Sequence, residues 1–388
     1  MKKLIFNDNL TIKTIEDGSI KEFPCEFYDK YAQTLEKLNK SQEWKYQGQG
    51  AIFRGDTFQV EKVNTKNSYY TSLENFNEDK VLFSVTVKDV SGVFVKDLNA
   101  EKDSEAHVIH TNEGIFSGST PNADTSKIIT SLKQDYTTAH LAIFDLNTND
   151  LTTLTDGDCY DFDPYFSKIS SEKVLFSTKG VGRDSEGNFI KYSPASICAY
   201  DTEFCTLEEV LSSPDKSYEK PKDDASGNLY YIEKPVDEIK GGCAQSIWDI
   251  LCIPYRIIEA IIMFIEMFVV MFTGKGLTKN TGRSDVKQQD KTKGEIFIEG
   301  NLINAEKEYE NNLKHKDNFA GYAPHSWQLV KRDKNGTQTV LAHSVIDYAV
   351  LKDGSIVYTN GKHVLLLKDG KTEKLATANM CTQVAVIE

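Results

Sequence analysis

Short apolar segments recur along the chain, separated by longer stretches in which polar residues dominate. The segments lie at 4–6, 51–53, 81–83, 128–130, 174–176, 229–231 and 356–358. The starts at 4 and 51, at 81 and 128, and at 128 and 174 are each 46 or 47 residues apart. A recurring period of this size indicates an internal repeat in which each unit contributes one buried strand.

A second strand follows most of these segments and ends in a turn. In the stretch 140–155, an alternating strand ends at Asp145 and a threonine-rich strand returns. Alternation followed by Asp, Asn or Gly is typical of a β-hairpin. Each unit is therefore predicted to be a meander of about four strands in roughly 40–50 residues, the size of one β-propeller blade. Similar stretches lie at 92–99, 196–202, 326–342 and 363–376.

The two ends of the chain complement each other. Residues 3–23 parallel residues 355–375 element by element, so the chain starts at the second strand of a blade, and residues 382–388 supply the missing first strand. Sharing one blade between the ends would close the ring and remove open sheet edges. With seven apolar segments, the prediction is an all-β, seven-bladed β-propeller closed by its N- and C-terminal strands, with a helical insertion.

The residues from 141 to 178 resemble a known group of propellers. A strand ending at Asp145 is followed by a threonine-rich return and then by the run Asp163-Pro164-Tyr165-Phe166-Ser167 ahead of the next apolar segment. This arrangement resembles the TolB-like, or WD40-like, β-propellers. The family's Ser-Pro-Asp-Gly turn is degenerate here and reads Ser170-Ser171-Glu172. The resemblance implies the architecture and is almost silent on chemistry.

One interval is far longer than the repeat and holds a foreign segment. The predicted layout is propeller blades in 1–233, a helical and linker insertion in 234–326, and the blades that close the ring in 327–388. A helix is expected at about 247–272, because its few charged residues fall on one narrow arc of a broadly apolar surface. The following stretch, 273–293, carries six basic and two acidic residues.

Three roles are open for this helix: it caps its own propeller, lies on a membrane surface, or binds a partner protein. A spanning helix conflicts with a closed ring, since the strands on both sides of the insertion must join one propeller. An interfacial position, with the basic stretch near anionic headgroups, fits the pattern. The residues predicted to contact a membrane or a partner are Trp248, Ile250, Leu251, Arg256, Ile257, Ile258, Ile261, Phe264, Phe268, Phe272 and Lys275.

The insertion falls between the second and third strands of its blade, on the face where successive blades are also connected. Two other irregular segments, 26–46 and 179–195, are expected on this face. Binding residues concentrate on such loops. The candidate ligand residues there are Asp158, Asp161, Arg183 and Asp184.

The sequence gives no reason to expect a metal ion or another cofactor. The aspartates at 156, 158, 161 and 163 lack the central Gly and terminal Glu of an EF-hand loop and are expected to cap turns. The seven cysteines show no CxxC or CxxxC spacing, and the histidines are scattered. His107 and His110, three residues apart in a predicted strand, are expected on opposite faces.

The net charge and the N-terminal sequence bear on the class of protein and on its predicted location. With 45 basic and 58 acidic residues, the net charge of −13 disfavours general nucleic-acid binding. Only three apolar residues follow the first two lysines, so no secretory signal is expected. The predicted location is cytoplasmic, with the helix offering peripheral attachment to the inner face of the cell membrane.

No GxSxG, Walker, HExxH or GxGxxG motif occurs, and no catalytic residue is predicted. The predicted function is a monomeric, non-enzymatic binding scaffold whose partner is a protein or an anionic membrane surface. The alternative is a lyase or hydrolase at the mouth of the central channel. That enzyme would require convergent His, Asp, Glu or Arg side chains around a pocket.

Overall fold

The computed structural model describes residues 3–42, 68–88, 90–100, 104–236, 295–298, 301–315 and 319–387. The chain divides into two compact units. The first contains Met1–Val236 and Ala305–Glu388, and the second contains Asp237–Asn304. The predicted helix at 247–272 lies outside the described residues.

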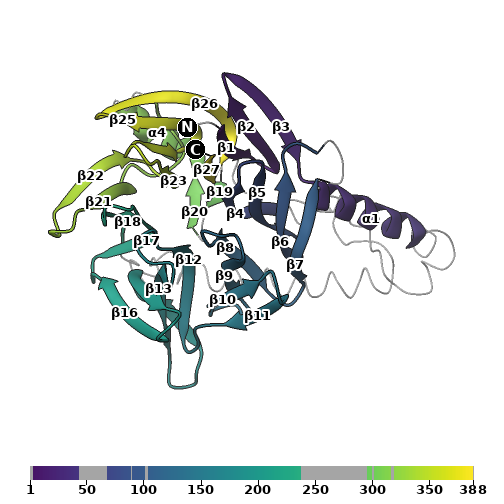
Figure 1. The fold of residues 1–388 in the computed structure, drawn as a ribbon, viewed down its shortest axis with the longest axis horizontal. Coiled ribbons are helices and arrows are strands. Elements are labelled where there is room, and N and C mark those ends of the chain that lie inside the picture. The colour runs from purple at the N-terminus through teal and green to yellow at the C-terminus, as the bar shows by residue number, and fades with distance from the viewer. Residues whose placement is uncertain are drawn as a thin grey trace, which may run out of the picture. The chain divides into compact units, whose positions relative to one another are not determined.

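The described part of the first unit forms six antiparallel sheets around a common centre (Figure 1). From the inner strand outward, blade 1 consists of β27 (Val384–Ile387), β1 (Lys3–Asp8), β2 (Thr11–Glu16) and β3 (Ser19–Pro24). Blade 2 consists of β4 (Ser68–Asn77), β5 (Lys80–Val87), β6 (Val90–Asp97) and β7 (Glu105–Thr111). Blade 3 consists of β8 (Ile115–Pro121), β9 (Lys127–Lys133), β10 (His140–Asp145) and β11 (Asp150–Thr153). Blade 4 consists of β12 (Cys159–Phe166), β13 (Lys173–Arg183), β15 (Ser196–Asp201) and β16 (Thr206–Leu211), and β14 (Phe189–Tyr192) pairs with β13. Blade 5 consists of β17 (Lys216–Asp223), β18 (Leu229–Pro235), β21 (Gln328–Arg332) and β22 (Gln338–His343). Blade 6 consists of β23 (Asp347–Val350), β24 (Ile356–Thr359), β25 (Gly361–Lys368) and β26 (Lys371–Cys381).

The prediction of seven blades is wrong, because the described residues make six. Six of the seven apolar segments become the second strands β1, β5, β9, β13, β18 and β24. The remaining segment, 51–53, lies outside the described residues. Between β3 and β4 the chain forms the 17-residue helix α1 (Glu26–Gln42), which lies within the irregular segment predicted at 26–46.

The predicted closure of the ring is confirmed. Strand β27 pairs antiparallel with β1, with Leu4 opposite Val386. The side chain of Asn7 reinforces this junction, because its Oδ1 accepts hydrogen bonds from the backbone N–H groups of Thr382 and Gln383, each at 2.8 Å. Blade 1 is thus completed by both chain ends, and β27 covers the inner edge of β1.

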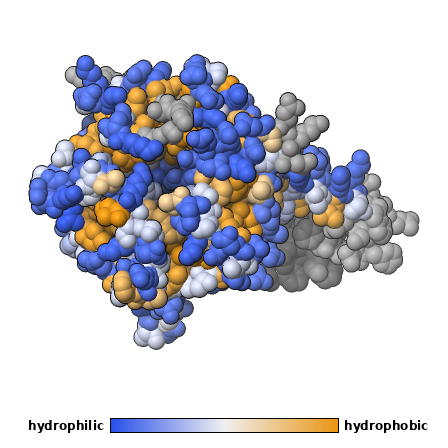
Figure 2. Space-filling model, viewed as in Figure 1, coloured by the Kyte–Doolittle hydropathy of each residue, from blue (hydrophilic) through white to orange (hydrophobic). Residues whose placement is uncertain are grey.

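Burial explains why the second strand of each blade marks the repeat. In β5 every residue after Lys80 is buried, because both faces of the strand pack against neighbouring blades. The outer strands β3 and β11 are almost fully exposed. Figure 2 accordingly shows hydrophilic residues over much of the periphery, with hydrophobic residues mainly farther in. A strand buried on both faces becomes a continuous apolar run, whereas an outer strand does not.

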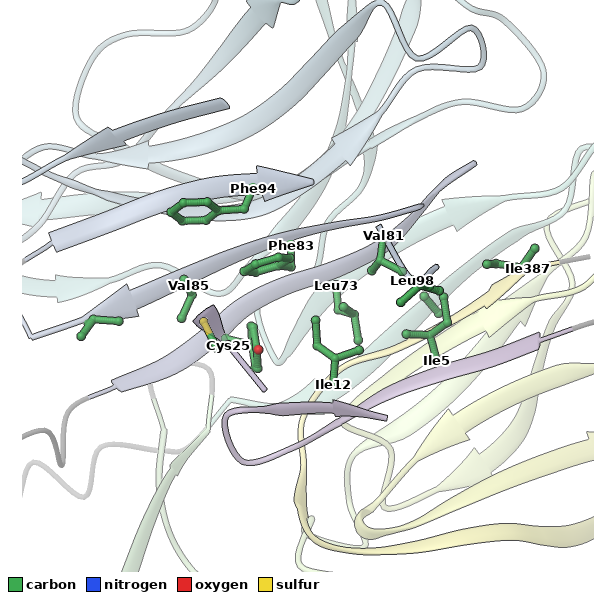
Figure 3. Packing of buried hydrophobic residues seen from close by; sticks show 13 residues of the cluster. Ile5, Ile12, Cys25, Leu73, Val81, Phe83, Val85, Phe94, Leu98 and Ile387 are labelled. Atoms are coloured by element: carbon green, nitrogen blue, oxygen red, sulfur yellow. The ribbon is translucent and has the colours of Figure 1, made fainter. Parts of the chain in front are cut away.

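Hydrophobic packing between blades forms the core. Ile5 of β1, Leu73 of β4, and Phe83 and Phe94 of blade 2 belong to one buried cluster, shown in Figure 3. The rings of Phe83 and Phe94 stack with their centroids 5.5 Å apart. Each such side chain contributes about 1.5–3 kcal/mol by leaving water.

The first turn of α1 is held from a distant strand. The carboxylate of Glu105 on β7 accepts hydrogen bonds from the backbone N–H groups of Glu26 (2.9 Å) and Phe27 (2.8 Å). Lys96 donates to the same carboxylate at 3.0 Å and is itself buried. A carboxylate at a helix N-terminus satisfies unpaired N–H groups and complements the helix dipole. This contact fixes α1 to blade 2.

The first unit also contains α4 (Ala305–Lys314), ahead of β21. The buried amide of Asn312 donates hydrogen bonds to the carbonyl groups of Gly321 (3.0 Å) and Ala323 (2.8 Å). In the second unit, β19 (Glu295–Ile298) and β20 (Asn301–Asn304) form an antiparallel hairpin. Within the described residues, no helix has the length and apolar character needed to cross a membrane.

Candidate functional site

The strand order places the long connections on one face of the propeller. Strands alternate in direction within each blade, so connections from second to third strands and from one blade to the next open on the same side. The connections from β3 to β4, from β13 to β15 and from β18 to β21 all do so. We name this side the connection face.

The candidate ligand residues take different positions near this face. Arg183 donates from Nε to Oδ1 of Asp158 at 2.9 Å, and from Nη2 to Oγ1 of Thr137 at 3.4 Å. These bonds join the β13–β14 hairpin to loops of blades 3 and 4. Asp184 closes the turn of that hairpin, since its carboxylate accepts hydrogen bonds from the backbone N–H groups of Glu186 and Asn188.

Asp161 lies deeper, 2% exposed, on the inner strand β12. Its carboxylate accepts hydrogen bonds from the hydroxyl groups of Thr155 and Thr178, both at 2.6 Å. The sulfur of Cys159 lies 3.4 Å from Oδ2 of Asp161 and 3.8 Å from Nδ1 of His140. Burial, together with the charge of Asp161, raises the pKa of the Cys159 thiol to about 12.

The trio His140, Cys159 and Asp161 has ligand atoms all within 4.8 Å of one another, and these residues could hold a metal ion. Sequence reasoning missed the trio because His140 starts β10 in blade 3, whereas the other two residues lie on β12 in blade 4. A parallel bridge between Ala139 and Tyr160 brings the strands together. No short spacing motif records a contact of this kind.

Aromatic and apolar side chains extend from this trio onto the hairpin. The rings of Tyr160 and Tyr192 lie 5.7 Å apart, and those of Tyr192 and Phe189 lie 4.8 Å apart. Phe189 is 42% exposed and its neighbour Ile190 is 59% exposed. The hydroxyl of Tyr192 donates to the carbonyl of Thr137 at 2.9 Å, which anchors the hairpin.

The central channel is lined by charged groups from the inner strands. Lys220 Nζ lies 3.2 Å from Oδ1 of Asp347, and Lys222 Nζ lies 2.8 Å from Oε1 of Glu74. Burial alone would lower the pKa of Lys222, but Glu74 and Asp347 outweigh it, so the net shift is upward and this lysine stays charged. The cavity between these groups has a volume of about 30 Å³. Since one water molecule needs about 10–15 Å³, the cavity has room for roughly two.

The prediction that His107 and His110 lie on opposite faces is wrong. Nε2 of His107 and Nδ1 of His110 are 2.6 Å apart. The pairing of β6 with β7 shifts register between Val93 and Phe94, which face Ile109 and His107 respectively. The extra residue of this bulge reverses the alternation that the prediction assumed.

The residues predicted to contact a membrane or a partner, from Trp248 to Lys275, all lie outside the described residues. Their assignment stays a prediction from sequence.

No family model matches the chain, and no curated protein matches it. Among solved structures, TolB from Acinetobacter baumannii is similar, with a TM-score of 0.50 and 9% identity over 99% of this chain. The chain spans 66% of TolB, just under two thirds of its length. A chain of a nidogen/laminin complex gives a TM-score of 0.46 at 9% identity, covering 99% of this chain and 97% of that one. The tricorn protease gives 0.44 at 12% identity, covering 98% and 36%.

At these identities the similarity concerns the fold alone. The sheet order, the shared closing blade and the match to TolB agree with one another. The chain has a TolB-like β-propeller fold, with six blades in its described residues.

Proposed function

We propose that this chain is a binding scaffold that engages a macromolecular partner through the connection face. The observation that carries the proposal is the concentration of long connections on this face, together with exposed apolar side chains on one of them. Phe189 and Ile190 stand on the anchored β13–β14 hairpin, 42% and 59% exposed. Apolar groups held in place on a rigid scaffold are suited to protein contact, because little conformational entropy is lost on binding.

The geometry of the channel favours a scaffold over an enzyme at that position. The alternative enzyme requires free acid and base groups around a pocket. Among the described channel residues, Lys220 pairs with Asp347 and Lys222 pairs with Glu74. Charges that neutralise one another around a cavity of about 30 Å³ serve mainly to hold the inner strands together.

The apolar segment around 247–272 is proposed to add attachment to an anionic membrane surface. It belongs to the connection between β18 and β21, and the basic stretch 273–293 follows it. A broad apolar face beside basic residues favours binding in the plane of the headgroups.

Flotation of the full chain with vesicles tests the attachment. Wild type is expected to float with vesicles of phosphatidylcholine and phosphatidylserine, and the double variant Ile257→Asp, Phe264→Asp is expected to remain at the bottom. The matched control is Ile169→Asp, Phe204→Asp, which replaces an exposed isoleucine and an exposed phenylalanine in loops of the opposite face. If wild type stays at the bottom, or the double variant floats equally well, membrane attachment is wrong.

A further inference from the structure

We propose that His140, Cys159 and Asp161 bind one zinc ion at the junction of blades 3 and 4. The site would lie on the connection face, at the start of strands β10 and β12. It is independent of the partner-binding role, since it concerns a metal ion held within the propeller.

Two of the three distances between the ligand atoms are close to those of a tetrahedral metal site. With metal–ligand bonds of about 2.0–2.3 Å, the edges of a zinc tetrahedron between sulfur and nitrogen or oxygen are about 3.5 Å long. The sulfur of Cys159 lies 3.8 Å from Nδ1 of His140 and 3.4 Å from Oδ2 of Asp161. These two distances need shifts of only a few tenths of an ångström. A bound ion would also have to bring Nδ1 of His140 and the carboxylate of Asp161, which lie within 4.8 Å of each other, to a similar separation.

The chemistry of the donor set selects the class of ion. A cysteine sulfur and an imidazole nitrogen are suited to zinc and similar transition metals, whereas calcium and magnesium prefer oxygen ligands alone. The carboxylate of Asp161 supplies a third donor that also occurs in zinc sites. Three protein ligands leave the fourth position of the ion to water.

The backbone and the surrounding side chains hold the ligands in place. The backbone N–H of Asp161 donates to the carbonyl of Ala139 at 2.9 Å, and that of Ala139 donates to the carbonyl of Cys159 at 3.2 Å. His140 follows Ala139 directly, so these bonds fix all three ligands together. The hydroxyl groups of Thr155 and Thr178 orient the Asp161 carboxylate, as outer partners of metal ligands commonly do.

A nucleophilic pair of Cys159 and His140 explains the cluster less well. A reactive cysteine requires positive surroundings that favour the thiolate. Here the carboxylate of Asp161 lies 3.4 Å from the sulfur, and Asp156 and Asp158 add negative charge. A negative site with a soft donor attracts a cation and disfavours an isolated thiolate.

Titration of the chelator-treated full chain with cobalt(II), followed by competition with zinc, tests the proposal. Cobalt is expected to bind with one-to-one stoichiometry and to show a sulfur-to-cobalt charge-transfer band, which zinc removes. Cys159→Ser should abolish this band, and His140→Ala should weaken zinc binding at least tenfold. The control Cys205→Ser, which changes an exposed free cysteine, should leave the charge-transfer band and the zinc affinity unchanged.

The variant Thr178→Val keeps all three ligands and guards against a folding defect in Cys159→Ser. It should lower zinc affinity by about 10–100-fold through the lost support of Asp161. The absence of a charge-transfer band in wild type would overturn the proposal. So would an undiminished band in Cys159→Ser, since the metal would then lie elsewhere.

Discussion

At the scale of single residues, Glu219 shows how this propeller tolerates buried charge. It lies on β17, with Lys179 of blade 4 on one side and Lys234 of its own blade on the other. Burial alone would raise the pKa of Glu219, but the two lysines outweigh it and bring the pKa down to about 2. The carboxylate therefore joins two blades only while it is charged.

Replacing Glu219 with Gln is expected to lower the free energy of unfolding by about 3 kcal/mol at neutral pH, because buried Lys234 loses its counter-ion. Because the pKa of Glu219 is lower in the folded state than its ordinary value of 4.5, the carboxylate stabilises the folded protein fully above pH 4.5. This stabilisation is lost as the pH falls towards the folded-state pKa of about 2. Urea unfolding should therefore show a smaller difference between variant and wild type at pH 3 than at pH 7.

The matched control is Glu233→Gln, which removes the partner of Lys216 in a more exposed pair. It should cost less than about 1 kcal/mol. Equal losses for the two variants, or a Glu219→Gln effect that does not change with pH, would contradict this account.

At the scale of elements, the junction of β1 and β27 carries the closure. Asn7 is 3% exposed, and its side chain accepts two backbone hydrogen bonds from the C-terminal segment. Asn7→Ala leaves these two N–H groups without their acceptor. The expected loss in unfolding free energy is about 2 kcal/mol, measured by chemical denaturation.

Asn335→Ala serves as the control, because Asn335 is exposed in the turn between β21 and β22. Its effect should stay within about 0.5 kcal/mol. Hydrogen exchange adds a local readout: Asn7→Ala should speed exchange in β1 and β27 more than in blade 4. If Asn7→Ala speeds exchange equally in all blades, the variant has not weakened the closure specifically, and this account is wrong.

Elements also show how far the sequence could predict this fold. The second strands are visible because they are buried on both faces, and the two chain ends are visible because they parallel each other. The prediction of seven blades is wrong: six of the seven apolar segments form second strands of the described blades, and the segment 51–53 lies outside the described residues. Local alternation also failed at His107 and His110, where a bulge changes the register.

The candidate site was less predictable than the fold. Asp158 and Asp184 lie on connections of one face, and Arg183 ends β13 beside them; that these residues bind a ligand stays a prediction. The trio around Cys159 could not be anticipated, because its histidine comes from another blade. The hydrogen bonds from the first turn of α1 to Glu105 could not be predicted either, since Glu105 lies 78 or more residues from that turn in the sequence. Contacts between blades depend on the ring geometry rather than on spacing along the chain.

At the scale of the whole molecule, the propeller is a closed ring with two unlike faces. One face receives the long connections and the exposed hairpin residues, while the other receives shorter turns such as that between β12 and β13. Two exposed isoleucines mark these faces: Ile190 on the hairpin is 59% exposed, and Ile169 in the β12–β13 turn is 63% exposed. These two positions therefore form a matched pair for testing which face binds the partner.

Photo-crosslinking from these two positions tests the central claim most directly. The full chain would carry a photoreactive amino acid in place of Ile190 or of Ile169 in living cells, and adducts would be separated by mass. Binding through the connection face predicts a discrete, heavier protein adduct from position 190 and none from position 169. An adduct from position 169 alone, equal adducts from both positions, or none from position 190 would contradict it.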